Sequence, residues 1–419
     1  MHPNALIEHA TELLHRVLRF DKPADAVVSD FFREHREFGP RERATLAETA
    51  FDVLRQRLLY QHLAQSGSGE MERRLAILGW HGNAGFLRAA LSDAERAWLD
   101  RVGQIDRASL PEKLRHNLPD WLAETLQPQL GDEFWPWVER VSAPAPLDLR
   151  VNTWQADRNA VQAELAAAGI DAQPTPYSPI GLRIDGKPAL QKLDVFKRGA
   201  VEVQDEGSQL LVMLTGARRG EMVVDFCAGA GGKTLALGAQ MRNTGRLYAF
   251  DVSGHRLAAL KPRLARSGLS NVYPVQIAHE RDDRIQRLAG KIDRVLVDAP
   301  CSGLGTLRRN PDLKWRQSPE GIADMRPKQA AILKAAARLV KPGGRLVYAT
   351  CSPLEAEDED VAREFAESHP NWAALPVSSL LEAAHVAAAQ TLVAGEYLRL
   401  WPHRHGTDGF FAAVWQKGG

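Results

Sequence analysis

The chain has few cysteines and no long apolar run, and each of these absences argues against particular classes of protein. Its 419 residues include only three cysteines, at 227, 301 and 351. A small, odd and widely spaced set predicts neither a disulfide framework nor a metal centre, so we expect a metal-free protein in the reducing cytoplasm. No apolar stretch approaches the roughly 18 residues that span a bilayer. The opening Met-His-Pro-Asn-Ala also lacks the basic start and apolar stretch of an export signal. Membrane and secreted classes are therefore not expected.

The net charge is small, but the charges are unevenly spread. The formal net charge is +1, yet residues 1–130 carry 17 Lys plus Arg against 19 Asp plus Glu, whereas residues 242–350 carry 21 against 9. A local positive excess is typical of a surface that contacts nucleic-acid phosphates, and also of an ordinary solvated basic face. The 44% hydrophobic and 25% charged residues indicate a globular chain, whose length predicts two or three domains.

Hydrophobic spacing divides the chain into three parts. Within residues 1–140, apolar residues recur every three or four positions, as over 6–18 and 44–63, which predicts an all-helical domain. Residues 141–203 begin with a Pro-rich turn and place short strand-like pieces around one helix-like stretch, which predicts a small α+β connector. The third part is residues 204–419.

In the third part, apolar strands alternate with helix-like stretches. This alternation predicts an α/β fold with a doubly wound, mostly parallel sheet, closed by an antiparallel hairpin over 397–401 and 410–415. The other predicted strands are 222–227, 246–252, 272–277, 292–298 and 345–351.

A glycine-rich loop joins the first of these strands to a helix, and it reads Cys227, Ala228, Gly229, Ala230, Gly231, Gly232, Lys233. Glycines let a ligand approach the helix N-terminus, whose free N–H groups favour an anion. Two nucleotide patterns each miss by one residue, because position 227 is not the Gly of a P-loop and position 234 is not the third Gly of a dinucleotide fingerprint. Asp251, at the end of the next strand, is placed to bind a ribose of a dinucleotide or of S-adenosylmethionine.

Two of the cysteines follow the ends of predicted strands. Cys301 lies in Asp298-Ala299-Pro300-Cys301-Ser302-Gly303, and Cys351 lies in Thr350-Cys351-Ser352. Open α/β sheets bind their ligands at the carboxyl ends of strands, so both thiols are predicted to face one crevice. A lone cysteine is more often a small buried hydrophobic residue, but two at matched strand ends favour a shared chemical role.

These motifs resemble the RNA 5-methylcytosine methyltransferases of the RsmB, Sun or Fmu type. The resemblance covers about residues 204–417, and it is weaker over 117–126 and 147–153. The start of the chain is similar to a diverged, shortened NusB-like RNA-binding domain. The matching segments are VQDEGSQL at 203–210, DFCAGAGGKT at 225–234, DAPCSGLGTLRRNPDLKW at 298–315, YATCSPLEAED at 348–358 and HGTDGFFAAVW at 405–415.

The resemblance implies a Rossmann-like class I fold, S-adenosylmethionine as cofactor and RNA as partner, with small-subunit (16S) ribosomal RNA as the expected substrate. It assigns the nucleophile that adds to carbon 6 of cytosine to Cys351. Asp298 would hydrogen-bond the ring edge, and Cys301 would help to release the enzyme after methyl transfer. Lys233 would pair with the methionine carboxylate of the cofactor or with a phosphate. The candidate cofactor residues are Cys227, Ala228, Gly229, Ala230, Gly231, Gly232, Lys233, Asp251, Arg256, His279 and Asp298.

The chain departs from the family pattern after the third strand. There the family places an acid against the adenine, whereas this chain has His279, with Glu280, Asp282 and Asp283 nearby as substitutes. Residues 308–315 mix cations with Trp315, which suits a path for single-stranded RNA or an ordinary exposed loop.

Three alternatives stay open from the sequence. The same chemistry could act on tRNA or another RNA, the chain could be a non-catalytic RNA-binding factor, or it could be a Rossmann oxidoreductase. The intact cysteine pair disfavours the second, and the missing third glycine disfavours the third. We expect a monomer.

Overall fold

The computed structural model describes residues 1–419, which divide into two compact units. One comprises Met1–Pro144 together with Thr306–Pro319, and the other comprises Ala145–Gly305 together with Glu320–Gly419. We call them the helical unit and the sheet unit. A segment of fourteen residues from the middle of the chain, 306–319, is therefore part of the helical unit.

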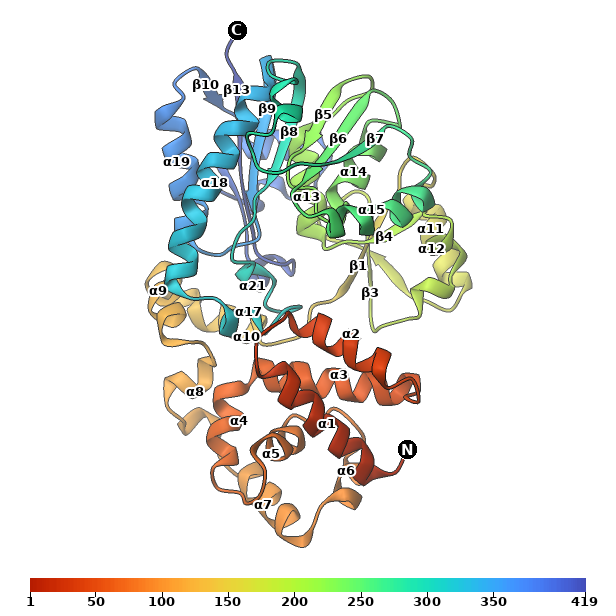
Figure 1. Cartoon of the computed structure of the whole chain (residues 1–419), viewed down its shortest axis with the longest axis vertical. Coiled ribbons are helices and arrows are strands. Elements are labelled where there is room, and N and C mark those ends of the chain that lie inside the picture. The colour runs from red at the N-terminus through yellow and green to blue at the C-terminus, as the bar shows by residue number, and fades with distance from the viewer. The chain divides into compact units, whose positions relative to one another are not determined.

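The helical unit contains helices and no strand, as predicted. Amphipathic spacing is the reason: in α1, for example, Leu6, Ile7, Ala10, Leu13 and Leu14 are buried, and they recur on one face of the helix. Figure 1 shows the elements of this unit, with α1 in red. The helices are α1 (Pro3–Val17), α2 (Ala24–Glu34), α3 (Pro40–Arg55), α4 (Arg57–Ala64), α5 (Met71–Leu78), α6 (Ala84–Ala90), α7 (Asp93–Gly103), α8 (Glu112–His116), α9 (Asp120–Leu130), α10 (Phe134–Val141) and, from the inserted segment, α17 (Leu313–Arg316).

The periodic stretch over 44–63 is not one continuous helix. It breaks at Gln56, whose φ of −109° and ψ of 24° lie outside the helical range and separate α3 from α4. The side chain of Asn117 stabilises the break, because its Oδ1 accepts from the Leu58 amide at 2.8 Å while its Nδ2 donates to Gln56 Oε1 at 3.0 Å. A hydrophobic pattern continues across such a break, so it could not reveal one.

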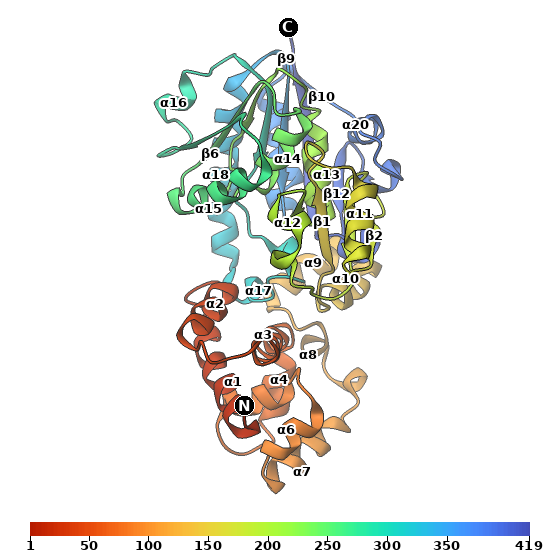
Figure 2. The ribbon, with the colours of Figure 1, turned by 90° about the vertical axis from the view of Figure 1, so that its right-hand side faces the viewer.

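The sheet unit begins with a small antiparallel sheet of order β2-β3-β1-β4. Its strands are β1 (Leu147–Val151), β2 (Ala172–Pro174), β3 (Gly181–Ile184) and β4 (Val201–Val203), with α11 (Arg158–Ala167) and α12 (Asp194–Lys197) beside them (Figure 2). This confirms an α+β fold for the connector, whose apolar residues, such as Leu149, Val151, Leu165 and Leu182, form a separate small core.

The large sheet has nine strands, and eight of them follow the order β11-β12-β13-β9-β8-β5-β6-β7, with β10 paired to β13. Strands β5 to β9 pair in parallel, whereas β10 to β13 pair antiparallel. The predicted strands and the closing hairpin are confirmed. The short strands β10 and β11 were not predicted. The strands are β5 (Met222–Asp225), β6 (Arg246–Asp251), β7 (Val272–Gln276), β8 (Ile292–Asp298), β9 (Val340–Thr350), β10 (Trp372–Ala374), β11 (Val393–Ala394), β12 (Tyr397–Leu400) and β13 (Phe410–Lys417).

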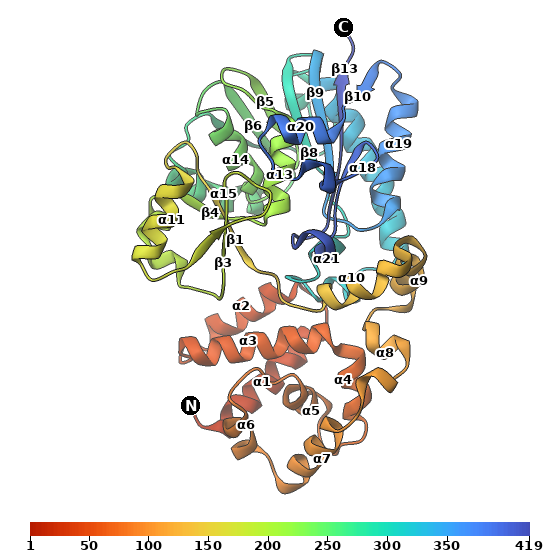
Figure 3. The ribbon, with the colours of Figure 1, turned by 180° about the vertical axis from the view of Figure 1, so that it is seen from behind.

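Alternate residues of the strands pack into two cores, one on each face of the sheet. Val223 and Leu296 belong to the core under α13, α14 and α20, whereas Val224 and Val295 belong to the core under α18 and α19. In Figure 1 α18 and α19 lie in front of the sheet, and in Figure 3 α20 does. The helices are α13 (Glu206–Thr215), α14 (Gly232–Gln240), α15 (Gly254–Ser267), α16 (Asp283–Gln286), α18 (Pro319–Leu339), α19 (Glu359–Ser368), α20 (Val377–Ala383) and α21 (Pro402–His405).

The strand order places a switch point beside β5. The chain runs from β5 outward to β6 and β7 on one side, and then returns to β8 and β9 on the other. In doubly wound sheets, ligands bind outside the carboxyl ends of the strands at such a point. None of the helices has the length and apolar character needed to span a membrane.

Candidate active site

The glycine-rich loop after β5 requires two of its glycines. Gly229 and Gly231 have φ values of +56° and +84°, a region that favours glycine. A Cβ on Gly231 would lie 2.1 Å from Cδ1 of Leu260, so this position also needs the space. A Cβ on Gly229 would meet nothing within 4 Å, so the loop is open on that side. The loop thus exposes its backbone to a ligand next to the start of α14.

Asp251, at the end of β6, fastens this loop. Its Oδ2 accepts from the Gly229 amide at 2.8 Å, and its Oδ1 accepts from the Ser253 amide at 2.7 Å. Each carboxylate oxygen has a second lone pair, so Asp251 can still accept from the hydroxyls of a ribose, as the sequence predicts. The loop and Asp251 fit the nucleoside part of S-adenosylmethionine.

Lys233, in the first turn of α14, forms an ion pair with Asp298 at the end of β8. The distance from Nζ to Asp298 Oδ2 is 2.6 Å, and the two side chains are 14% and 27% exposed. Burial lowers the pKa of Lys233, but Asp298 and then Cys351 and Asp225 raise it more strongly, so the net pKa is above its ordinary value. Lys233 therefore stays protonated beside Asp298 and within electrostatic reach of Cys351.

The structure brings Cys301 and Cys351 together. Their Sγ atoms are 3.5 Å apart, and both side chains are partly buried. Adjacent strands β8 and β9 hold them in register, with the Ala299 amide donating to the Ala349 carbonyl at 2.8 Å. The hydrogen bond to Cys351, then burial, then the charge of Cys351 raise the pKa of Cys301 well above its usual range. Cys301 is therefore a protonated thiol.

A buried carboxylate that the sequence analysis missed joins the two cysteine loops. Glu357 is fully buried. Its Oε1 accepts from the Ser302 amide at 2.8 Å and from Gln329 Nε2 at 3.1 Å, and its Oε2 accepts from the Ser302 and Ser352 hydroxyls, each at 2.5 Å. Ser302 follows Cys301 and Ser352 follows Cys351. The sequence feature that could have pointed to Glu357 is its position, six residues after the second cysteine.

Asp358, the next residue, anchors the second loop from its other side. Its carboxylate accepts from the hydroxyl of Thr350 and from the guanidinium of Arg399, and it is fully buried. Burial raises the pKa of Asp358 to about 8, although Arg399 and the Thr350 hydroxyl oppose the shift. Cys351 is thus held between two buried carboxylates of one loop.

The third cysteine is partly buried in the cofactor loop, and the acid of β5, Asp225, is fully buried beside it. Burial, followed by Asp298, Asp225 and Asp251, raises the pKa of Cys227 well above its usual range, so it is a neutral thiol. Burial also raises the pKa of Asp225 to about 7, although the Thr234 hydroxyl, at 2.7 Å, opposes the shift. Oδ1 of Asp225 has no hydrogen-bond partner. Asp225 was not among the predicted site residues.

The residues predicted to meet the adenine lie after β7. His279 is exposed, and its Nδ1 accepts from the Arg281 amide at 3.1 Å. Asp282 already accepts from the amides of Ala278 and Arg284, each at 2.9 Å. Glu280 is paired with Arg281 at 3.2 Å. Each oxygen of Asp282 keeps a second lone pair, as those of Asp251 do, so His279, Glu280 and Asp282 all stay candidates for the adenine contact.

The other predicted cofactor residues lie in the loop after β5, at the start of α14 or on α15. Ala228 is buried, the Ala230 carbonyl accepts from Arg263 Nη1 at 2.7 Å, and Gly232 begins α14. Arg256 is exposed on α15, and its charge lowers the pKa of Cys227, so it lies within electrostatic reach of the loop.

The prediction of an RNA path over 308–315 is wrong for two of its cations. Arg308 and Lys314 are 1% and 4% exposed inside the helical unit. Lys314 Nζ donates to the Arg55 carbonyl at 2.8 Å, and Trp315 Nε1 donates to the Leu54 carbonyl at 2.7 Å. Side chains of this segment hold it against α3, which sequence composition could not show.

A doubly wound sheet with this loop, a strand-end acid and two facing thiols defines a Rossmann-like methyltransferase. Two family models match the chain. One is described as 16S rRNA methyltransferase RsmB/F and covers residues 212–416, and the other is described as the ferredoxin-like domain of RsmF/B-like methyltransferases and covers residues 118–191.

Individual proteins agree with these models. A probable ribosomal RNA small subunit methyltransferase B from Synechocystis is 35% identical over 75% of this chain and 70% of its own length. A probable ribosomal RNA small subunit methyltransferase B from Bacillus subtilis is 31% identical over 82% and 76%. The crystal structure of PH0851 has a TM-score of 0.81 at 28% identity, over 100% of this chain and 99% of that chain. The chain belongs to the RsmB/F methyltransferase family, which uses S-adenosylmethionine.

Proposed function

We propose that this protein methylates carbon 5 of a cytosine in small-subunit ribosomal RNA through a transient bond between Cys351 and carbon 6 of the base. The observation that carries the proposal is the pair of thiols, 3.5 Å apart, beside the Lys233–Asp298 ion pair. The family and the names of the two bacterial relatives support ribosomal RNA as the substrate.

The chemistry explains why a thiolate is needed. Carbon 5 of cytosine is too weak a nucleophile, so the Cys351 thiolate first adds to carbon 6 and shifts an electron pair toward carbon 5. S-adenosylmethionine, when bound, supplies an electrophilic methyl group. Carbon 5 takes the methyl group, a base then removes the proton from carbon 5, and the bond between sulfur and carbon 6 breaks to return the thiolate.

Each neighbouring residue has a role in this sequence. The Lys233 ammonium places a positive charge within electrostatic reach of the attacking sulfur of Cys351, and opposite charges attract each other in a partly buried site. Asp298 contacts the ring edge of the cytosine. The target base has to leave its stack to reach the thiols.

Cys301 is suited to the later proton transfer. The hydrogen bond to Cys351 and the charge of Cys351 are two of the three leading causes that raise the pKa of Cys301. Both causes disappear once the sulfur of Cys351 is bonded to carbon 6. Cys301 then no longer faces a charged sulfur at the step where a base is needed.

Bisulfite sequencing of RNA from a strain lacking the gene tests the proposal. We expect one cytosine of the small-subunit ribosomal RNA to lose its protection from deamination, and the purified protein with S-adenosylmethionine to restore it. Loss of protection in a tRNA instead would replace the substrate and keep the chemistry. No change in any RNA, with no methyl transfer by the purified protein, would refute the proposal.

A further inference from the structure

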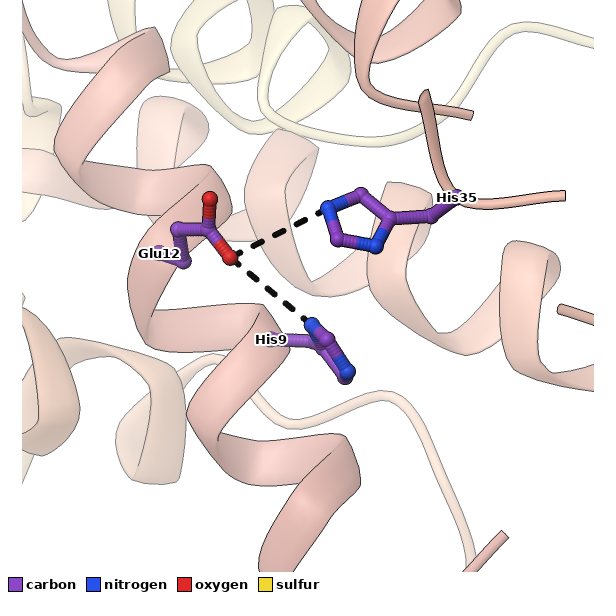
Figure 4. A group of neighbouring side chains, drawn as sticks. All are labelled: His9, Glu12 and His35. Atoms are coloured by element: carbon purple, nitrogen blue, oxygen red, sulfur yellow. Dashed lines mark ion pairs between the residues drawn. The ribbon is translucent and has the colours of Figure 1, made fainter. Parts of the chain in front are cut away.

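A group of two imidazoles and a carboxylate lies in the helical unit. His9 and Glu12 are three residues apart on α1, and His35 directly follows α2 (Figure 4). Glu12 Oε2 is 3.8 Å from His9 Nδ1 and 4.0 Å from His35 Nε2. One donor atom of each residue lies within 4.8 Å of the others. A tetrahedral zinc ion with bonds of about 2.0–2.1 Å has donors about 3.3 Å apart, so small side-chain shifts would close this group around one ion.

Surrounding residues orient these three donors. Glu37 Oε1 lies 3.0 Å from His35 Nδ1, which leaves the lone pair of Nε2 for a metal, as carboxylates beside metal-binding histidines do. Arg16 donates to Glu12 Oε1 at 2.6 Å and leaves Oε2 toward the imidazoles. The buried ring of Phe38 lies 4.9 Å from the ring of His9 and 5.2 Å from that of His35.

The local charge also favours a divalent cation. Arg16 pairs with Glu12 and Glu34, and a third carboxylate, Glu37, pairs with His35, so three carboxylates and one guanidinium contact the group or its ligands. We propose that His9, Glu12 and His35 bind one Zn²⁺ ion, which joins α1 to the segment between α2 and α3. The donor set of two imidazoles and one carboxylate suits zinc and leaves a fourth position to water.

The chain contains a matched control on the same helix. His15 approaches Glu70 through Nε2 and Glu72 through Nδ1, at 3.8 Å for the second pair. One donor atom of each of His15, Glu70 and Glu72 also lies within 4.8 Å of the others, but this group has one imidazole instead of two, and the His15 and Glu70 side chains are 46% and 49% exposed. His15→Gln removes a histidine from a His–Glu group without changing the proposed site.

The experiment is a zinc titration of the full chain, freed of metal, against a chromophoric chelator. We expect one tight site, which His9→Gln or His35→Gln weakens at least tenfold and Glu37→Gln weakens by about tenfold, whereas His15→Gln leaves it unchanged. Circular dichroism checks that each variant is folded. No tight site, or one that the His9 and His35 variants keep, would overturn the proposal.

The visible absorption spectrum of bound Co²⁺ distinguishes this site from the thiol pair. The measurement uses the unsubstituted chain, so it does not depend on whether the variants fold. Cobalt bound by nitrogen and oxygen gives visible absorption without a sulfur-to-metal charge-transfer band. A strong charge-transfer band at one equivalent would place the ion at Cys301 and Cys351 and would also overturn the proposal.

A separate observation in the sheet unit carries a second inference, which rests on the proposed function. The four hydrogen bonds of Glu357 reach the residues that follow both cysteines, and Gln329, which also donates to the Pro300 carbonyl at 3.0 Å. We infer that Glu357 is a positioning residue, which sets the distance between the two thiols without touching the base.

Glu357→Gln tests this inference, because an amide replaces one acceptor oxygen with a donor. Glu355→Gln is the matched control, since Glu355 is exposed in the same short turn, η5 (Glu355–Glu357). We expect Glu357→Gln to lower kcat at least tenfold with little change in the KM for S-adenosylmethionine, and Glu355→Gln to change neither.

Two measurements, the kcat of methyl transfer and the rate of thiol alkylation, distinguish an error in the positioning role of Glu357 from an error in the proposed function. The rate at which the thiols react with an alkylating reagent should change in Glu357→Gln even if the substrate assignment is wrong. An unchanged kcat and an unchanged alkylation rate in a folded Glu357→Gln protein would refute the positioning role. Absence of any methylation by the unsubstituted chain would instead refute the proposed function.

Discussion

The inserted segment of the helical unit and the cysteine loops of the sheet unit bury ionisable side chains in different ways. Around the cysteines, two buried carboxyl groups meet an opposite charge or several donors, as in the Arg399–Asp358 pair and the four bonds of Glu357. In the helical unit, Lys314 is buried against the Arg55 carbonyl, and Arg55 donates to the Arg308 carbonyl at 3.2 Å. Burial is the largest cause that lowers the pKa of both cations, to about 7 for Lys314.

Buried charged groups therefore have two different roles in this protein. Around the cysteines, an ion pair and hydrogen bonds to buried carboxyl groups fix loops whose geometry the chemistry needs, and they offset part of the cost of burial. In the helical unit, cations bonded to main-chain carbonyls hold the segment 306–319, and much of the desolvation cost stays uncompensated. Substitutions of the charged residues around the cysteines should therefore reduce activity, and those at Lys314 should change stability.

The largest effect is expected at Cys351. Cys351→Ala should remove methyl transfer and every covalent complex with RNA, because no bond to carbon 6 can form. Cys301→Ala should leave attack and transfer intact but slow release, so a complex that survives denaturation should accumulate. Gel mobility after denaturation measures the complex, with methylated RNA as the control for transfer. A complex in Cys351→Ala that is absent from Cys301→Ala would reverse the two roles.

The next largest effect is expected at Lys233. Lys233→Met removes the ammonium beside Cys351 and Asp298, and should lower methyl transfer by about 100-fold, as the loss of a charge-stabilising donor typically does. Part of the loss should be recovered at higher pH, where a thiolate forms without help. Lys261→Met, on α15, is a control of the same type. A pH–rate profile parallel to that of the unsubstituted protein would contradict the electrostatic role.

Lys314 should affect stability with a defined dependence on pH. Its pKa of about 7 in the folded chain lies below the ordinary value of 10.5, so between these values only the unfolded chain holds the proton. The free energy of unfolding should therefore rise with pH across this window, by up to about 1.4 kcal/mol per pH unit, and the penalty is complete below pH 7.

Urea denaturation of the unsubstituted protein and Lys314→Met, at pH 7, 8 and 9, isolates this contribution. The difference between the two proteins should change with pH in favour of the unsubstituted chain. Lys113→Met, in the same unit, is the control, because Lys113 is 54% exposed and pairs with Asp120. A difference that does not vary with pH would show that Lys314 carries no such penalty.

The smallest effect is expected at His279. His279→Asp should keep or tighten the binding of S-adenosylmethionine, by about threefold at most, because a carboxylate can accept from the adenine amine. Calorimetry measures the affinity. A loss in Glu280→Ala would show that the neighbour has taken this role. Abolished binding in a folded His279→Asp protein would mean that the alignment after β7 is incorrect.

The local sequence was sufficient to predict most helices and strands and the positions of many candidate site residues. The alternation of strands and helices predicted the sheet, because the side-chain periods of strands and helices are short-range properties. Both cysteines could be placed at strand ends, and Gly229 and Gly231 in a turn, for the same reason. The strands β10 and β11 have three and two residues, which is too short for a period to be recognised.

Contacts between distant residues were decided only by the tertiary structure. Glu357 meets Ser302 across 55 positions, and His35 approaches Glu12 across 23, so no local pattern marks either group. The chain alone also could not show that Lys314 is buried, since its composition is that of an exposed RNA-binding loop and its partner, Arg55, is 259 positions away. The sequence by itself was enough to place the acids, the glycines and the two cysteines at the carboxyl ends of the strands. The packing of segments far apart in the chain decided which charges are buried, paired or free to bind, because burial depends on the neighbours that folding supplies.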